Sequence, residues 1–274
     1  MPTPVPLSST QPAALSPLAL LAPPHWRHID FISDLHLQAS EPATFAAWQH
    51  YLQTTPADAV FILGDLFEVW VGDDALGASP EASFEDACVA VLKAASQRLS
   101  VFFLHGNRDF LLAGGFTKAS GAVLLDDPCC LSFAGERWLL SHGDALCLQD
   151  TAYLQFREQV RHPDWQRAFL NKPLAERQTF ARALRTESEA RKKTGLPYAD
   201  VDEAAACAWL QSAQANTLIH GHTHKPADHE LNCKGVTQAH HRRLVLSDWD
   251  ASADPPRTEV LRLGLAHPPT RIRV

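Results

Sequence analysis

The sequence is short of several features, and each shortage excludes a class of protein. No stretch approaches eighteen consecutive apolar residues, so a membrane-spanning helix is not expected. Basic charge is not in excess, because 24 Lys and Arg residues stand against 31 Asp and Glu residues. The resulting net charge of −7 argues against a protein that coats nucleic acid. Cysteine is sparse, with six in 274 residues and no regular spacing, which favours reduced thiols in a cytoplasmic protein over a disulfide framework.

The first 25 residues differ in composition from the rest of the chain. They are rich in Pro, Ala, Ser and Leu and carry no charged side chain before His25. The apolar stretch 13–22 is short, is interrupted by Pro17 and lacks a preceding basic segment, so a signal peptide is not expected. We interpret residues 1–25 as a disordered N-terminal extension.

Short apolar runs that end in polar residues recur along the rest of the chain. Such runs are typical of strands buried on both faces, and helix-compatible stretches over 42–53 and 81–98 separate several of them. The runs cover residues 29–33, 59–63, 101–104, 138–141 and 217–219. Two later runs, 244–246 and 259–265, follow without helices and indicate strands of a second sheet. The pattern predicts an α/β fold with its core over residues 26–150 and 216–274.

Residues 151–215 are predicted to be a helical insertion in this core. Between positions 151 and 197 the chain has ten basic and five acidic residues, whereas the remainder has 14 basic and 26 acidic residues. Large apolar residues alternate with the basic ones, a pattern that suits a ligand with aliphatic tails and an anionic head. The same pattern is typical of a helix lying on an anionic membrane. A third interpretation makes the aromatic residues core and the arginines a solvated face.

Polar residues of a restricted kind follow five of the predicted strands. In an open α/β sheet, ligand sites form just beyond the carboxyl ends of the strands, so these groups are expected at one rim. Asp34 and His36 are two residues apart, as are His222 and His224, and extended backbone would place each pair on one side. The glycines beside these motifs permit sharp turns and close approach to a ligand. The motifs are Ser33-Asp34-Leu35-His36, Gly64-Asp65, Gly106-Asn107-Arg108-Asp109, His142-Gly143-Asp144 and Gly221-His222-Thr223-His224.

Carboxylates, a carboxamide and imidazoles without cysteine suit a divalent cation such as Mn²⁺, Fe²⁺ or Zn²⁺. The seven candidate ligands are Asp34, His36, Asp65, Asn107, His142, His222 and His224. Seven ligands are too many for one catalytic ion and fit two ions that share a carboxylate. Such a pair activates water and holds the oxygens of an in-line displacement at phosphorus, which predicts hydrolysis of a phosphate ester or anhydride.

This ordered set of motifs resembles the calcineurin-like metallophosphoesterases over residues 28–265. The resemblance implies two mixed sheets flanked by helices, with a dinuclear site at the strand ends. It implies that Asp34, His36 and His224 hold one ion. Asn107, His142 and His222 would hold the other, and Asp65 would bridge the two ions.

Longer strings resemble one branch of that family, the UDP-2,3-diacylglucosamine diphosphatases of lipid A biosynthesis. The strings are FISDLHL (31–37), GDLFEVWVGDD (64–74), HGNRDFLLAGG (105–115), SHGDALC (141–147) and IHGHTHKP (219–226). The resemblance implies two Mn²⁺ ions and water attack on the α-phosphorus of UDP-2,3-diacylglucosamine. The products would be UMP and 2,3-diacylglucosamine 1-phosphate. It also implies a cytoplasmic protein bound peripherally to the inner membrane.

Arg108 stands where most relatives in the wider family have a histidine that donates a proton to an alcohol leaving group. A sugar 1-phosphate is already a weak base and needs little help from a general acid. It does gain from a fixed cation, because guanidinium binds phosphate oxygens bidentately. We therefore interpret Arg108 as a diphosphate clamp rather than as a surface arginine.

The resemblance also assigns residues of the insertion, although this stretch departs from the branch's pattern. Alignment over residues 185–196 needs a one-residue gap, and an asparagine usual in this region is missing. The choice of Lys192 over Lys193 or Thr194 therefore stays open. Residues expected to carry catalysis are Asp65, Asn107, Arg108 and His222, and those expected to bind substrate are Asn107, Arg108, Asp150 with Tyr153 beside it, Ser188, Lys192 and His222.

Two rival functions remain open at this point. One is a dinuclear phosphodiesterase or phosphatase with another substrate, against which Arg108 counts. The other is a non-catalytic scaffold on the same fold, against which the complete set of seven ligands counts. A nuclease is disfavoured by the acidic composition.

Overall fold

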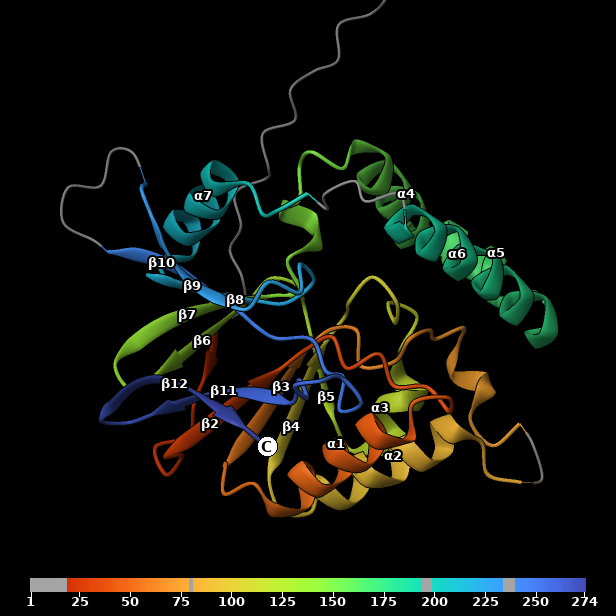
Figure 1. The fold of residues 1–274 in the computed structure, drawn as a ribbon, viewed down its shortest axis with the longest axis horizontal. Helices are drawn as coiled ribbons and strands as arrows, with labels where there is room; N and C mark the ends of the chain where they lie inside the picture. Colours follow the sequence, from red (N-terminus) through yellow and green to blue (C-terminus); the bar gives the residue numbers. More distant parts are fainter. Residues whose placement is uncertain (1–18, 79–80, 194–198, 234–239) are drawn as a thin grey trace, which may run out of the picture.

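The computed structural model describes residues 19–78, 81–193, 199–233 and 240–274, and within residues 184–193 the helical backbone alone. Two six-stranded sheets pack face to face, and helices cover their outer surfaces (Figure 1). This is the α/β architecture that the strand pattern predicts. In the described ranges no helix combines the length and the apolar character needed to cross a membrane.

The first sheet has the strand order β12-β11-β2-β3-β4-β5. Its strands are β2 (His28–Ile32), β3 (Ala59–Leu63), β4 (Ser100–Leu104), β5 (Val123–Leu125), β11 (Glu259–Gly264) and β12 (His267–Arg273). The strands β2 to β5 run parallel, and β11 pairs with β2 antiparallel. Side chains alternate along β3: Val60 and Ile62 pack under the helices, whereas Phe61 and Leu63 face the other sheet. Because both faces are buried, the strand is apolar throughout.

The second sheet has the order β1-β6-β7-β8-β10-β9. Its strands are β1 (Ala19–Leu21), β6 (Cys129–Phe133), β7 (Glu136–Ser141), β8 (Thr217–His220), β9 (Ala227–Leu231) and β10 (His241–Val245). The prediction that runs 244–246 and 259–265 belong to one second sheet is wrong, because β10 lies here and β11 lies beside β2. An apolar run identifies a strand but not its pairing partner.

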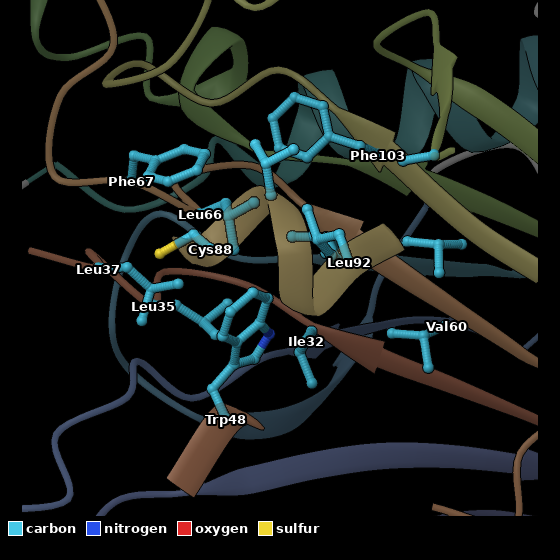
Figure 2. Close-up of a cluster of buried hydrophobic side chains, with 14 of the residues drawn as sticks. Ile32, Leu35, Leu37, Trp48, Val60, Leu66, Phe67, Cys88, Leu92 and Phe103 are labelled. Carbon is cyan, nitrogen blue, oxygen red and sulfur yellow. The ribbon is translucent and has the colours of Figure 1, made fainter. Parts of the chain in front are cut away.

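Three helices cover the outer face of the first sheet: α1 (Pro42–Thr54), α2 (Phe84–Ala95) and α3 (Gly114–Ser120). Trp48 of α1 and Leu92 of α2 lie in one buried cluster with Ile32 and Val60 (Figure 2). A capping box begins α2, since the Ser83 hydroxyl accepts a bond from the backbone N–H of residue 86, whose carboxylate accepts one from the Ser83 N–H. This layer fixes the loops that leave β2, β3 and β4.

The helices described within the predicted insertion, 151–215, fall into two groups. The last helix, α7 (Glu203–Ala213), packs Ala206 and Leu210 against Leu139 and Leu218 and so covers the outer face of the second sheet. The remaining helices are α4 (Thr151–Arg161), α5 (Pro163–Leu170) and α6 (Leu174–Lys193), which form a separate group beyond the strand ends (Figure 1). We call residues 151–193 the cap. Helical periodicity alone does not distinguish a core-covering helix from a cap helix.

Two expectations about the chain's periphery are corrected. The expectation of disorder over residues 1–25 is wrong for β1, which pairs in parallel with β6, and residues 1–18 lie outside the described residues. The expectation of reduced thiols is wrong for Cys207 and Cys233, which form a disulfide between α7 and the segment after β9. Their separation of 26 residues gives no sign that the fold brings the two Cα atoms to 5.4 Å. The four remaining cysteines are buried and take no part in this disulfide.

Candidate metal centre

The seven candidate ligands lie in loops that follow β2, β3, β4, β7 and β8. These strands belong to both sheets, and their carboxyl ends meet at one rim of the sandwich. The fold brings all seven side chains into one continuous cluster, which we call the metal rim. Because the ligands come from five loops, the rim depends on the relative placement of the two sheets.

One group on the rim consists of Asp34, His36 and His224, whose ligand atoms are close enough to hold a metal ion. His224 Nε2 lies 3.3 Å from His36 Nε2 and 3.3 Å from Asp34 Oδ1. The donor atoms of the three side chains therefore converge on one point. The resemblance implies the same three residues as the ligands of one ion.

The second group centres on Asp65 and Asn107. Asn107 Oδ1 lies 2.9 Å from His142 Nε2 and 2.9 Å from His222 Nδ1. Asp65 Oδ2 is 3.7 Å from His142 Nε2 and 4.0 Å from His36 Nε2, so this carboxylate faces both groups. That position is the one a bridging ligand needs.

The backbone at the rim is not extended, contrary to the sequence expectation. Five ligands have positive φ: Asp34 (53°), His36 (47°), Asp65 (52°), His222 (65°) and His224 (53°). Each such residue costs of order 1–3 kcal/mol, and residues of this kind cluster at functional sites. The conformation is stabilised by main-chain bonds between loops, as when the N–H groups of positions 34 and 36 donate to the carbonyls of Gly64 and Asp65. Residue spacing does not show this, because the bonds join loops that are distant in sequence.

Two glycines confirm the expected close approach of backbone to the rim. A Cβ atom at Gly106 would lie 2.0 Å from Asp65 Oδ1, and one at Gly221 would lie 2.3 Å from Asp34 Oδ2. Real Cβ atoms do not approach other atoms that closely. Any side chain at these positions would displace a candidate ligand.

Charge is concentrated on the rim, where the ligands perturb one another. Burial opposes ionisation of Asp34, but His224, His142 and His36 outweigh it and hold the pKa of this carboxyl well below its usual range. Burial also lowers the pKa of His142, yet the carboxylates of Asp65, Asp34 and Asp144 together raise it to about 9. Buried carboxylates at this density need cationic partners.

The residues of the rim fit divalent cations. Carboxylate, carboxamide and imidazole donors are the set that Mn²⁺, Fe²⁺ and Zn²⁺ accept, and they converge here without cysteine. A cation would also supply the positive charge that the protonated imidazole of His142 otherwise provides. The structure and its fold therefore support binding of divalent metal ions at this rim.

Asp109, the last residue of the motif Gly106-Asn107-Arg108-Asp109, holds the loops after β3 and β4 together. Its carboxylate is fully buried and accepts bonds from the backbone N–H groups of Gly106 (2.9 Å), Leu66 (2.7 Å) and Asp65 (3.3 Å). Burial and the nearby Asp65 raise the pKa of Asp109 to about 7. One side chain thus fixes Asp65 relative to the loop that carries Asn107.

Asp144, to which no role was assigned from the sequence, connects the rim to the cap. Its Oδ2 accepts a bond from Arg157 Nε at 2.8 Å and another from the Tyr153 hydroxyl, both on α4. The Tyr153 ring stacks on His222 with centroids 6.0 Å apart. The available signal was its place as the third residue of His142-Gly143-Asp144, two positions after a candidate ligand.

The two other predicted substrate contacts with described side chains are Arg108 and Asp150. Arg108 lies on the rim, where its backbone N–H donates to Asp65 Oδ1 at 2.8 Å and its side chain is 18% exposed. Asp150 is the N-cap of α4 and accepts a bond from the backbone N–H of Tyr153 at 3.1 Å. Asp150 therefore sets the point at which the cap leaves the core.

The predictions for Ser188 and Lys192 fall in α6 within the segment whose side chains lie outside the described residues. Asp73 and Asp74 have structural partners. Asp73 accepts bonds from Trp70 Nε1 and from the backbone at the start of α3, and Asp74 pairs with Arg177 of the cap.

Several known proteins are similar to this chain over most of its length. The pattern of the calcineurin-like phosphoesterases matches residues 27–226. A UDP-2,3-diacylglucosamine hydrolase from Chromobacterium violaceum is 45% identical over 230 residues, which cover 81% of this chain and 90% of that protein. A protein of the same description from Bordetella pertussis is 42% identical over 229 residues, with 82% and 87% coverage. A solved archaeal phosphodiesterase is 13% identical with a TM-score of 0.45, covering 90% of this chain and 99% of that one.

The family pattern spans well over half of the chain, and the matched range contains the loops that form the metal rim. The alignments also cover most of the length of both relatives. The chain belongs to the calcineurin-like phosphoesterase family.

Proposed function

We propose that this chain hydrolyses the diphosphate of UDP-2,3-diacylglucosamine, giving UMP and 2,3-diacylglucosamine 1-phosphate. The observation that carries this proposal is the similarity of 39–45% to relatives described as UDP-2,3-diacylglucosamine hydrolases, over about four fifths of the chain. A metal-dependent hydrolase of phosphorus anhydrides is also the activity that the rim's donor set supports.

Asp34, His36 and His224 would hold one Mn²⁺ ion and Asn107, His142 and His222 the other, with Asp65 between them. The convergence of each group and the position of Asp65 support this assignment. When bound, the ions supply an activated water and positive charge for an in-line displacement at phosphorus.

Arg108 would bind the diphosphate beside the metal rim. Its backbone is fixed by Asp65, and Trp70 N–H donates to the Arg108 carbonyl at 3.1 Å, so the guanidinium extends from a rigid support. A fixed guanidinium stabilises charge that develops on phosphate oxygens during attack on the α-phosphorus. Asn107 and His222, which belong to the second group of ligands, would orient the same phosphate.

The acyl chains would lie in the groove of the cap. This groove between α5 and α6 has a volume of about 660 Å³ and is lined mainly by Trp165, Ala168, Phe169, Ala175 and Phe180. The Trp165 ring also packs on Phe110, with centroids 6.4 Å apart, two residues after Arg108. The groove therefore begins next to the loop that would hold the diphosphate. Asp150, Ser188 and Lys192 are proposed to contact the head of the substrate.

The cap is also proposed to contact the cytoplasmic face of the inner membrane peripherally. Phe180 (41% exposed) and Leu170 (39%) present large apolar side chains on the cap, close to the exposed Arg167. Apolar groups beside basic ones favour an anionic lipid surface. Flotation with anionic vesicles should recover the protein, whereas F180S/L170S should stay in the soluble fraction.

The activity is tested with purified protein, Mn²⁺ and UDP-2,3-diacylglucosamine by measuring UMP. In ¹⁸O-labelled water the label should enter UMP, because water attacks the α-phosphorus. Label in the sugar phosphate would contradict that attack. Absence of turnover together with hydrolysis of a simple phosphodiester would favour a phosphoesterase with another substrate.

A further inference from the structure

Glu68 lies between a candidate metal ligand and the proposed phosphate clamp. Its Oε2 is 3.2 Å from His36 Nδ1, and its Oε1 is 3.8 Å from Arg108 Nη1. Each carboxylate oxygen thus faces a different functional side chain. All three side chains are largely shielded from water, with exposures of 13% for Glu68, 19% for His36 and 18% for Arg108.

The backbone around Glu68 is fixed to both neighbouring loops. The Glu68 N–H donates to the Leu37 carbonyl at 3.2 Å, beside a β-bridge between Leu37 and Phe67. Two residues on, the Trp70 N–H donates to the Arg108 carbonyl. The segment that carries Glu68 is therefore bonded to the loop of His36 on one side and to the loop of Arg108 on the other.

A histidine that binds a metal through one ring nitrogen carries its proton on the other, and a carboxylate at that nitrogen fixes the tautomer and the ring orientation. His36 presents Nε2 to the rim and Nδ1 to Glu68. The same carboxylate also limits the positions that the Arg108 guanidinium occupies, which lowers the ordering cost of phosphate binding.

We propose that Glu68 is a positioning residue that couples metal binding to phosphate binding, by orienting His36 and Arg108 with its two oxygens. The Arg108 part of this proposal rests on the proposed function, whereas the His36 part does not. Asp248 offers a matched comparison within the described residues: its Oδ2 lies 3.8 Å from His224 Nδ1, and Arg257 is its other charged partner. Asp248 therefore supports one ligand of the same group without facing Arg108.

The first measurement is calorimetric titration of the metal-free protein with Mn²⁺. Glu68→Gln keeps the size of the side chain and removes its charge. This variant and Asp248→Asn should both lose affinity, by about 10–100-fold for a lost partner of a metal-binding histidine. Wild-type affinity in Glu68→Gln would overturn the His36 part whether or not the protein turns over any substrate.

The second measurement is binding of inorganic phosphate to each variant at saturating Mn²⁺. Glu68→Gln should bind phosphate more weakly than wild type, whereas Asp248→Asn, whose carboxylate does not face Arg108, should not. Adding Glu68→Gln to Arg108→Ala should cause no further loss of phosphate affinity, because Glu68 acts through Arg108. Unchanged or tighter phosphate binding in Glu68→Gln would overturn the coupling.

Failure of the wild-type protein to cleave UDP-2,3-diacylglucosamine would count against the proposed function alone, since both titrations need no turnover. Thermal melting confirms that each variant is folded.

Discussion

The metal rim and the cap lie next to each other but are held in place by different means. Rim ligands are positioned by backbone conformation, with five of the seven at positive φ. The main chains of Asp34, His36, Asp65 and His222 also form hydrogen bonds to adjacent loops. The cap is tied to the core by long side chains. Arg157 reaches Asp144, Arg161 donates to the Gly106 carbonyl at 2.7 Å, and Arg177 binds Asp74 and the carbonyl of residue 71. Changes to the rim should therefore abolish chemistry, while changes at the cap should alter substrate binding.

This difference also changes the meaning of the charge contrast in the sequence. The excess of basic residues in the insertion indicated a surface for an anionic ligand or membrane. The structure directs Arg157, Arg161 and Arg177 inward instead, and Arg177 is only 1% exposed. Part of the basic charge of the cap therefore serves to attach the cap to the core. The surface interpretation remains for the outer residues, among them Arg167, which is 74% exposed.

The largest expected effect is on Asp65, the carboxylate that faces both groups of ligands. Asp65→Ala should lower kcat by about 1,000-fold or more, since losing one preorganised charged group commonly costs 100–1,000-fold and this one is proposed to contact two ions. Steady-state kinetics with UMP detection measures the loss. The exposed carboxylate of Asp126 provides a control, and Asp126→Ala should leave turnover unchanged. Near-wild-type turnover in Asp65→Ala would contradict the mechanism.

A smaller loss is expected for Arg108, which is proposed to bind the substrate and not the metals. Arg108→Ala should reduce kcat/KM by about 100-fold through the lost charge-assisted bonds. Arg108→Lys should recover only part of the loss, because an ammonium cannot bind two oxygens in the fixed geometry of guanidinium. Kinetics and Mn²⁺ titration of the two variants separate substrate from metal effects. Equal activity of Lys and Arg at this position would argue against bidentate binding.

At the cap, Arg177→Met should weaken attachment without disturbing the rim. The guanidinium binds Asp74 and the backbone carbonyls of Val71 and Lys172, and a Cβ at Gly72 would lie 2.3 Å from its Nη1. Loss of these bonds should raise KM by about tenfold and lower stability by about 1–3 kcal/mol, with kcat and Mn²⁺ affinity preserved. Chemical denaturation and kinetics measure both effects. A parallel fall in Mn²⁺ affinity would show that cap and rim are not separable.

The residues of the rim could be predicted from the sequence more completely than the contacts of the cap, and the reason is physical. Asp34, His36, His222 and His224 stand in short motifs at strand ends, where topology alone brings them together. Their left-handed backbone conformation could not be predicted, because hydrogen bonds to loops distant in sequence stabilise this part of the rim. A charge count, such as that of the insertion, also does not reveal the direction of an arginine.

Other features depend on three-dimensional proximity in the same way. The short strand β1 and the Cys207–Cys233 disulfide follow from neighbours that residue spacing does not indicate. Glu68 lies within a string quoted for its resemblance, yet its two partners, His36 and Arg108, come from other loops. The fold class is thus readable from periodicity, while pairing, attachment and support of the ligands require the structure.

The smallest expected effect is a pH dependence of metal binding that belongs to the rim alone. In the metal-free protein the pKa of His142 is raised to about 9 from its ordinary 6.5. The protonated imidazole therefore stabilises the metal-free fold fully below pH 6.5, and this contribution is lost as the pH rises through about 9. A cation must displace that proton, so Mn²⁺ affinity should increase with pH, by about threefold between pH 7.0 and 7.5 for one proton released. Calorimetry in two buffers of different ionisation enthalpy counts the proton. Arg177→Met should show the same slope, because no ligand of the rim changes, and a slope altered by this cap variant would contradict the separation of the two regions.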